Sequence, residues 1–155
     1  MKAKSFYLQN ELIRSNAISY IEDIECDGKT KVTISNAGSK SSKQRGLQWR
    51  WYADVAKSGK GNSDLDEDVD LECKWIFARP ILLRDDDWFR DLFTMYMAKY
   101  KDDPERIKWF TKHMIHTESF NTSQMAEYLD GMEKYYISHD IPLTDPREYG
   151  LKRAA

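Results

Sequence analysis

Cysteines are few in this chain, and long apolar runs are absent. Its two thiols, Cys26 and Cys73, are too sparse and too far apart for a disulfide framework, so both are predicted to be free thiols that serve as packing residues. No stretch approaches the roughly eighteen apolar residues of a membrane-spanning helix, and the N-terminus carries no apolar signal region. We therefore expect a cytoplasmic protein that does not enter a membrane.

Recognisable cofactor and catalytic motifs are also missing. Residues 58–63 resemble a phosphate-binding loop in composition, but they lack its spacing, its preceding strand and its Gly-Lys-Ser or Gly-Lys-Thr ending. His113 and His116 have helical spacing without the glutamate of a zinc protease between them. The sequence predicts a protein with no cofactor and no metal, and the leading expectation is that it is not an enzyme.

Four alternating acids, from Asp64 to Asp70, leave one enzymatic alternative open. A calcium loop needs glycine at its sixth position and an acid at its twelfth, where this chain has Val69 and Trp75. A small metal-dependent nuclease uses such acids to hold its ions, so this reading stays as an alternative. The other interpretation is a solvated acidic run that leads into a helix.

Positive and negative charges are segregated along the chain. The net charge of 155 residues is only -2, yet residues 28–60 hold eight Lys or Arg against one acid. Residues 61–103 reverse this balance, with twelve acids against six bases. A local basic surface holds phosphates whatever the total charge, so the pattern favours a nucleic-acid-binding face with acidic flanks.

Residues 40–57 combine this basic charge with aromatic rings at helical spacing. Leu47, Trp51 and Val55 recur every four residues and are predicted to face the core. Lys43, Arg50 and Lys57, seven residues apart, are predicted to form a stripe beside them. Such interleaving of cations and rings suits a nucleic-acid backbone and its bases. The residues expected on phosphates are Lys40, Lys43, Arg45, Arg50, Lys57 and Lys60, with Trp49 and Tyr52 stacking on bases.

The remaining pattern predicts an α+β fold, a mostly helical single domain over residues 1–155 with a small N-terminal β-sheet. Residues 1–36 read as strand, helix and strand, with strands at 4–8 and 29–35 around a helix over 11–25. The basic aromatic helix follows at 41–57. The part from 64 to 153 is predicted to be helical, with one helix over 71–79 limited by Pro80 and later helices starting at Asp85 to Asp87, Asp103, Asn121 and Asp145.

Two motifs resemble the NinB family of phage recombination proteins. The first consists of Ser41, Gln44, Trp49, Asp54 and Val55 at their observed spacing. The second is the stretch 116–129, which is similar to the family's Thr/Ser-rich link and the helix after it. Together with the order of elements before the first motif, the matched pieces cover about a third of the chain.

This resemblance implies a homodimer that binds single-stranded DNA, cooperates with the host single-strand-binding protein and helps to load the recombinase. It adds Gln44 and Trp49 as DNA contacts, and the link residues Thr117, Ser119 and Asn121 as a second surface. Helical geometry alone places Gln44 near the packed side instead. The family's basic pair in that link is replaced here by Ser119 and Asn121. A protein-binding adaptor that uses the helix from Thr122 to Ser138 is the other alternative.

Overall fold

The computed structural model describes residues 4, 6, 8, 10–34 and 42–152. These residues belong to two compact units, 1–37 and 38–155, where the sequence predicts one domain. Within the described residues all regular structure is helical and no strand is present. The prediction of an α+β fold with an N-terminal β-sheet is therefore wrong.

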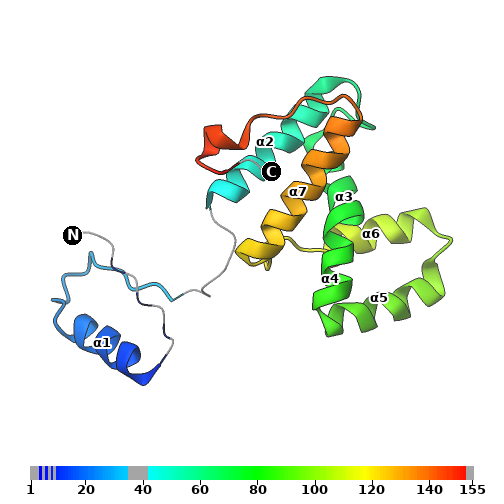
Figure 1. Cartoon of the computed structure of the whole chain (residues 1–155). Helices are drawn as coiled ribbons and strands as arrows, with labels where there is room; N and C mark the ends of the chain where they lie inside the picture. The colour runs from blue at the N-terminus through cyan, green and yellow to red at the C-terminus, as the bar shows by residue number, and fades with distance from the viewer. Residues whose placement is uncertain (1–3, 5, 7, 9, 35–41, 153–155) are drawn as a thin grey trace. The chain divides into compact units, whose positions relative to one another are not determined.

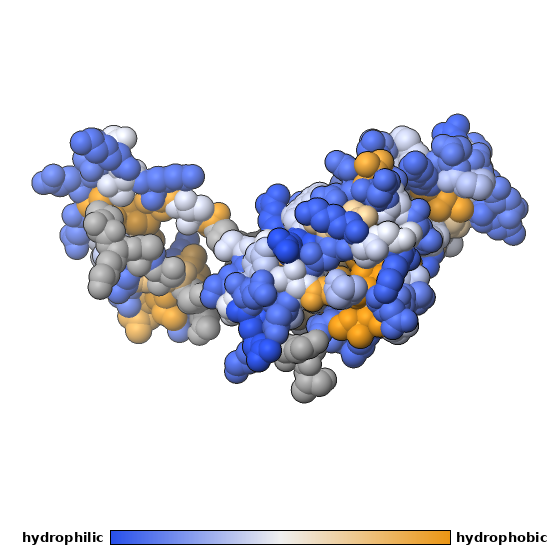
Figure 2. Space-filling view, turned by 90° about the horizontal axis from the view of Figure 1, so that it is seen from above, coloured by the Kyte–Doolittle hydropathy of each residue, from blue (hydrophilic) through white to orange (hydrophobic). Residues whose placement is uncertain are grey.

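The N-terminal unit is built around one helix, α1 (Glu11–Glu22), which confirms the helix predicted there. The Asn10 side chain caps it by accepting a hydrogen bond from the backbone N–H of Ile13 at 3.0 Å. No residue of α1 is buried. Hydrophobic residues accordingly gather on the surface of this unit, shown in orange in Figure 2, and its exposed large hydrophobics are Leu8, Leu12, Ile18, Ile21, Val32 and Ile34.

Residues 5 and 7 of the predicted strand 4–8 lie outside the described residues, and residues 4, 6 and 8 are not in a strand. The predicted strand 29–35 is absent over its described residues, 29–34, for a local and a general reason. Locally, the Asp27 carboxylate accepts the backbone N–H groups of Lys29 and Thr30 at 2.9 and 2.8 Å, so a turn occupies the start of the second strand. In general, β-branched residues favour strands because they fit a half-buried pleated surface. Val32 and Ile34 are exposed and have no such surface beneath them.

The C-terminal unit is an assembly of helices around the long helix α2 (Figure 1). Its elements are α2 (Ser42–Ser58), α3 (Asp66–Cys73), the π-helical turn η1 (Lys74–Ala78), α4 (Arg79–Asp85), α5 (Asp87–Tyr100), α6 (Pro104–Met114), α7 (Thr122–Ser138) and the 3₁₀ turn η2 (Pro146–Tyr149). Helix α2 packs against α3, α7 and η2, while α6 packs against α3 and α5 against α4.

Four helix starts in this unit confirm the predicted caps. Asp86, Asp103 and Asp145 each accept a hydrogen bond from a backbone N–H two or three residues later, at 2.9, 3.2 and 2.9 Å. Asn121 and Gln124 form a reciprocal capping box at the start of α7. Local side-chain chemistry is sufficient to place these boundaries.

Pro80 does not end the helix that contains it, contrary to the prediction. Helical structure runs without a break from Asp66 to Asp85 through α3, η1 and α4. A proline inside a helix lacks its N–H and its ring collides with the carbonyl four residues earlier. The π-helical turn Lys74–Ala78 directly precedes α4 and widens the backbone there, which makes room for the ring.

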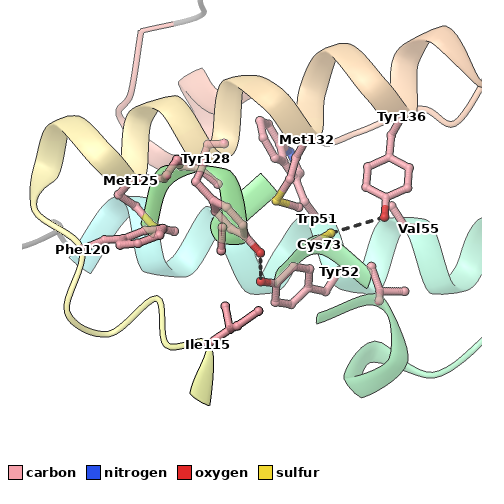
Figure 3. Close-up of a cluster of buried hydrophobic side chains, with 14 of the residues drawn as sticks. Trp51, Tyr52, Val55, Cys73, Ile115, Phe120, Met125, Tyr128, Met132 and Tyr136 are labelled. Carbon is pink, nitrogen blue, oxygen red and sulfur yellow. Dashed lines mark hydrogen bonds between the residues drawn. The ribbon is translucent and has the colours of Figure 1, made fainter. Parts of the chain in front are cut away.

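The core of this unit lies where α2, α3 and α7 meet (Figure 3). Trp51 and Val55 are buried in it, as the sequence predicts. Tyr52 is buried as well, although it was expected on a DNA-stacking face, and its hydroxyl lies 2.6 Å from that of Tyr128. Figure 3 shows this hydroxyl pair pointing inward from α2 and α7.

The two cysteines differ in their surroundings. Cys73 is buried, as predicted, and its Sγ lies 3.3 Å from the Tyr136 hydroxyl, the second dashed contact in Figure 3. Burial raises the pKa of the Cys73 thiol well above its usual value, which keeps it protonated and unreactive. Cys26 is exposed, so the prediction that it is a packing residue is wrong.

Candidate nucleic-acid interface

One side of α2 faces outward and carries cations that the sequence predicts to bind phosphates. Lys43, Arg45, Arg50 and Lys57 are all exposed. Trp49 is exposed on the same helix, with 46% of its surface accessible. The opposite side of the helix faces the core, so the predicted separation of a basic stripe from an apolar one is confirmed for these residues.

Trp49 is an exposed ring held at one edge. Its centroid lies 5.1 Å from that of Tyr52, and the two ring planes meet at 83°. Because Tyr52 is buried and hydrogen-bonded, this edge-to-face contact helps to fix the position of the tryptophan, while nearly half of its surface remains open to solvent. A ring fixed in this way loses little conformational entropy when a base stacks on it.

Arg50 has a second role, because it helps to hold the C-terminal segment on α2. Its Nε donates to Asp54 Oδ1 at 3.1 Å and to Thr144 Oγ1 at 3.0 Å. Asp54 Oδ2 in turn accepts the backbone N–H and the hydroxyl of Thr144, and the Trp51 indole N–H donates to the Thr144 carbonyl at 2.7 Å. The Asp54 carboxylate offsets part of the Arg50 charge, so Arg50 is a weaker phosphate ligand than its exposed neighbours.

Lys43, Arg45 and Lys57 form no ion pair within the part of the chain that the structure describes. Lys60 donates from Nζ to the Asp140 carbonyl at 2.9 Å and, with Lys57, lines a shallow depression of about 340 Å³ beside Pro142. These charges remain available to an external anion. Lys40, also expected on phosphates, lies outside the described residues.

Two residues expected to contact DNA are buried instead. Gln44 is 5% exposed and donates from Nε2 to the Thr122 carbonyl at 3.1 Å. Thr117 is 1% exposed and accepts from Gln48 Nε2 at 3.1 Å. Because both are buried, neither belongs to the candidate interface. Helical geometry correctly placed Gln44 near the packed side, and the DNA contact implied by the resemblance is wrong for this residue.

These buried hydrogen bonds nevertheless bring the two predicted surfaces together. Gln44 ties one flank of α2 to the first residue of α7, and Gln48 ties it to the link before α7, 78 and 69 residues further along the chain. Ser119 and Asn121 in that link are exposed. Asn121 uses its side-chain oxygen to accept the Gln124 N–H at 2.8 Å, so Ser119 is the freer of the two polar side chains.

A third group of rings and cations lies on α5 and α6 and was not identified from the sequence; Trp109 and His113 are exposed, whereas Tyr96 and Tyr100 are half-buried. It comprises Tyr96, Tyr100, Trp109 and His113 with Lys99, Arg106 and Lys112. The signal that would have found it is the run from Arg106 to His113, in which Trp109 and His113 are four residues apart on a capped helix. Ring contacts between two helices are not visible in either helix alone.

The acidic run before and within α3 is used in local contacts. Asp68 accepts a hydrogen bond from the Ser63 hydroxyl at 2.8 Å, and Asp70 pairs with Lys74 at 3.1 Å. Asp66, Glu67 and Asp68 lie in the first turn of α3, where the helix dipole favours negative charge. Among the described residues, no three His, Cys, Asp or Glu side chains are grouped so as to hold a metal ion.

The geometry thus defines a helical protein with basic and aromatic surface regions. Comparisons with protein-family models, with curated proteins and with solved structures find no match. In the described part of the chain, no helix combines the length and the apolar character needed to cross a membrane.

Proposed function

We propose that this protein binds single-stranded DNA through the outward side of α2 and the adjoining link before α7. The observation that carries the proposal is the exposed Trp49 indole, in edge contact with Tyr52, on the side of α2 that also exposes Lys43, Arg45 and Lys57. Cations on phosphates supply affinity that falls with salt, and the ring supplies a stacking platform that tolerates any base. Unpaired bases are required for such stacking, which favours single strands over duplex.

We further propose that the bound strand is handed on in recombination, as the resemblance to the NinB family implies. In this role the protein acts as a phage recombination mediator, without catalysis of its own, beside the host single-strand-binding protein and recombinase. It does so as a homodimer. A monomer mass by light scattering at working concentration, or unchanged recombinase loading in the presence of the protein, would remove this part of the proposal and leave DNA binding intact.

Trp49→Ala is expected to weaken binding of a single-stranded oligonucleotide by about 5- to 150-fold, the equivalent of one lost base stack. Fluorescence anisotropy of a labelled oligonucleotide measures it. Trp88→Ala is the matched control, because Trp88 is also an exposed tryptophan at a helix surface but follows the acidic residues Asp86 and Asp87. Equal losses in both variants, or none in either, would contradict the stacking role of Trp49.

Incubating the same oligonucleotide with the protein and a divalent metal ion tests the nuclease alternative. Incubation with Mg²⁺ or Mn²⁺ is expected to leave the oligonucleotide intact, because Asp68 and Asp70 are held by Ser63 and Lys74 and the acids of the described residues do not gather into a group that could hold a metal ion. Metal-dependent cleavage that is lost in Asp66→Asn and Asp68→Asn would instead assign catalysis to this run.

A further inference from the structure

Four aromatic rings on α5 and α6 lie in one continuous series. Tyr100 lies 4.8 Å from Tyr96, centroid to centroid. Tyr96 and Trp109 are 6.2 Å apart and nearly parallel, with 16° between their planes. His113 continues the series 5.0 Å beyond Trp109. Trp109 is 49% exposed, so this ring series reaches the surface at its centre.

The ring series is anchored to the protein beneath it. The Tyr96 hydroxyl donates to the Arg106 carbonyl at 2.9 Å, which ties α5 to the first turn of α6. The Tyr96 ring also lies 4.7 Å from Phe110, a fully buried residue. A platform held in this way is preorganised, and a ligand that stacks on it does not have to order the rings first.

Cations surround the ring series. Arg106 and Lys99 lie over the Tyr100 ring at 5.0 and 5.2 Å from its centroid, and Lys112 is three residues from Trp109 on the same helix. None of these three forms an ion pair within the described residues. The nearest acids in sequence sit at the α5–α6 turn and at Glu105, whereas residues 106–114 contain none.

We propose that this face of α5 and α6 is a second contact surface for single-stranded nucleic acid, with Trp109 stacking on an unpaired base and Arg106 and Lys112 binding phosphates. Charge complementarity identifies the ligand: cations without an ion-pair partner around the exposed Trp109 ring fit a polyanion whose bases are accessible. A duplex hides its base faces and offers nothing for Trp109 to stack on. The acids at the α5–α6 turn direct the strand toward Lys112 and His113.

This surface is separate from the side of α2 described above. Helix α3 packs against both α2 and α6 and stands between them in Figure 1. The inference therefore does not depend on DNA binding by α2. The two surfaces can be tested one at a time, by disabling one and measuring the other.

The test uses the full chain carrying Trp49→Ala together with Lys43→Gln, Arg45→Gln and Lys57→Gln, in which the α2 surface is disabled. Its residual affinity is measured for a single-stranded oligonucleotide and for an abasic strand of equal length, which keeps the phosphates and lacks the bases. Residual binding to the base-bearing strand is expected. Adding Trp109→Ala is expected to lower that binding by about 5- to 150-fold and to leave binding to the abasic strand unchanged.

Lys112→Gln and Lys108→Gln form the matched charge control. Both lysines are on α6, but Lys108 lines a groove of about 430 Å³ with the acids Asp68 and Glu72, and none of the four rings lines that groove. Lys112→Gln is expected to weaken binding and Lys108→Gln to leave it unchanged. Trp109→Phe keeps a ring and is expected to restore most of the affinity lost in Trp109→Ala, which separates stacking from a folding defect.

Three results would overturn the inference. The first is no binding by the α2-disabled chain at low salt, with the wild type binding normally. The second is equal loss on base-bearing and abasic strands in Trp109→Ala. The third is that the ring series has no affinity for the oligonucleotide and instead binds an acidic protein, in a complex that survives nuclease treatment. If the α2 variants bind the oligonucleotide as tightly as the wild type while Trp109→Ala loses affinity, this inference stands and the proposed role of α2 is wrong.

Discussion

Trp51→Ala is expected to lower the free energy of unfolding by about 3–5 kcal/mol, the usual cost of removing a large buried aromatic side chain. Trp51 is 1% exposed in the core between α2, α3 and α7. Its indole N–H also donates to the Thr144 carbonyl at 2.7 Å, so the substitution leaves a cavity and loosens the C-terminal segment at once. Urea denaturation followed by circular dichroism measures the change.

Trp49→Ala is the matched control for this prediction, because it removes the same side chain two residues away on the same helix. Trp49 is half exposed and meets Tyr52 in an edge-to-face contact, so its loss is expected to cost about 1 kcal/mol or less. Its DNA affinity should fall, whereas folded Trp51→Ala should still bind. Similar destabilisation by both substitutions would contradict the assignment of opposite faces to these two tryptophans.

Replacing Lys43, Arg45 and Lys57 together by glutamine is expected to reduce the slope of log affinity against log salt concentration by about 2. This value assumes one phosphate per cation and about 0.7 per contact for a single strand. The gap between wild type and variant should therefore widen about 100-fold when salt is lowered tenfold. Anisotropy titrations at several salt concentrations give both slopes.

A second triple variant controls for the change in total charge. Arg84, Lys134 and Arg147 are also exposed cations, but each is paired, with Asp85 and Glu127, with Asp130, and with Asp145. Their replacement by glutamine alters the net charge equally and is expected to leave the salt slope unchanged. If the two triple variants lose the same slope, binding follows net charge and not the α2 surface.

Local chemistry made the helix starts predictable. A cap needs only one side chain and a backbone N–H a few residues away, so Asp86, Asp103, Asn121 and Asp145 are readable in the sequence. The predicted strands depended on a partner surface, which the N-terminal unit does not provide within its described residues. The helix continues through Pro80 because a π-helical turn precedes it, and no residue pattern in the sequence predicts that turn.

The candidate site was predictable in part for the same reason. Periodicity placed Lys43, Arg50 and Lys57 on one stripe of α2 and Trp51 on the apolar stripe beside it, because both follow from helix geometry. The burial of Tyr52 and Thr117 depends on which segment covers them, and that segment lies far along the chain. The ring series on α5 and α6 is likewise a product of packing between two helices.

Photochemical crosslinking tests the central claim most directly, since it locates the bound strand on the folded protein. The full chain is irradiated with a single-stranded oligonucleotide that carries photoreactive bases, and the crosslinked peptides are identified by mass spectrometry. Crosslinks to Trp49 in α2 are predicted, together with crosslinks to Trp109 in α6, and both should disappear at high salt. Crosslinks confined to the N-terminal unit or to α7, or none at low salt, would contradict the account.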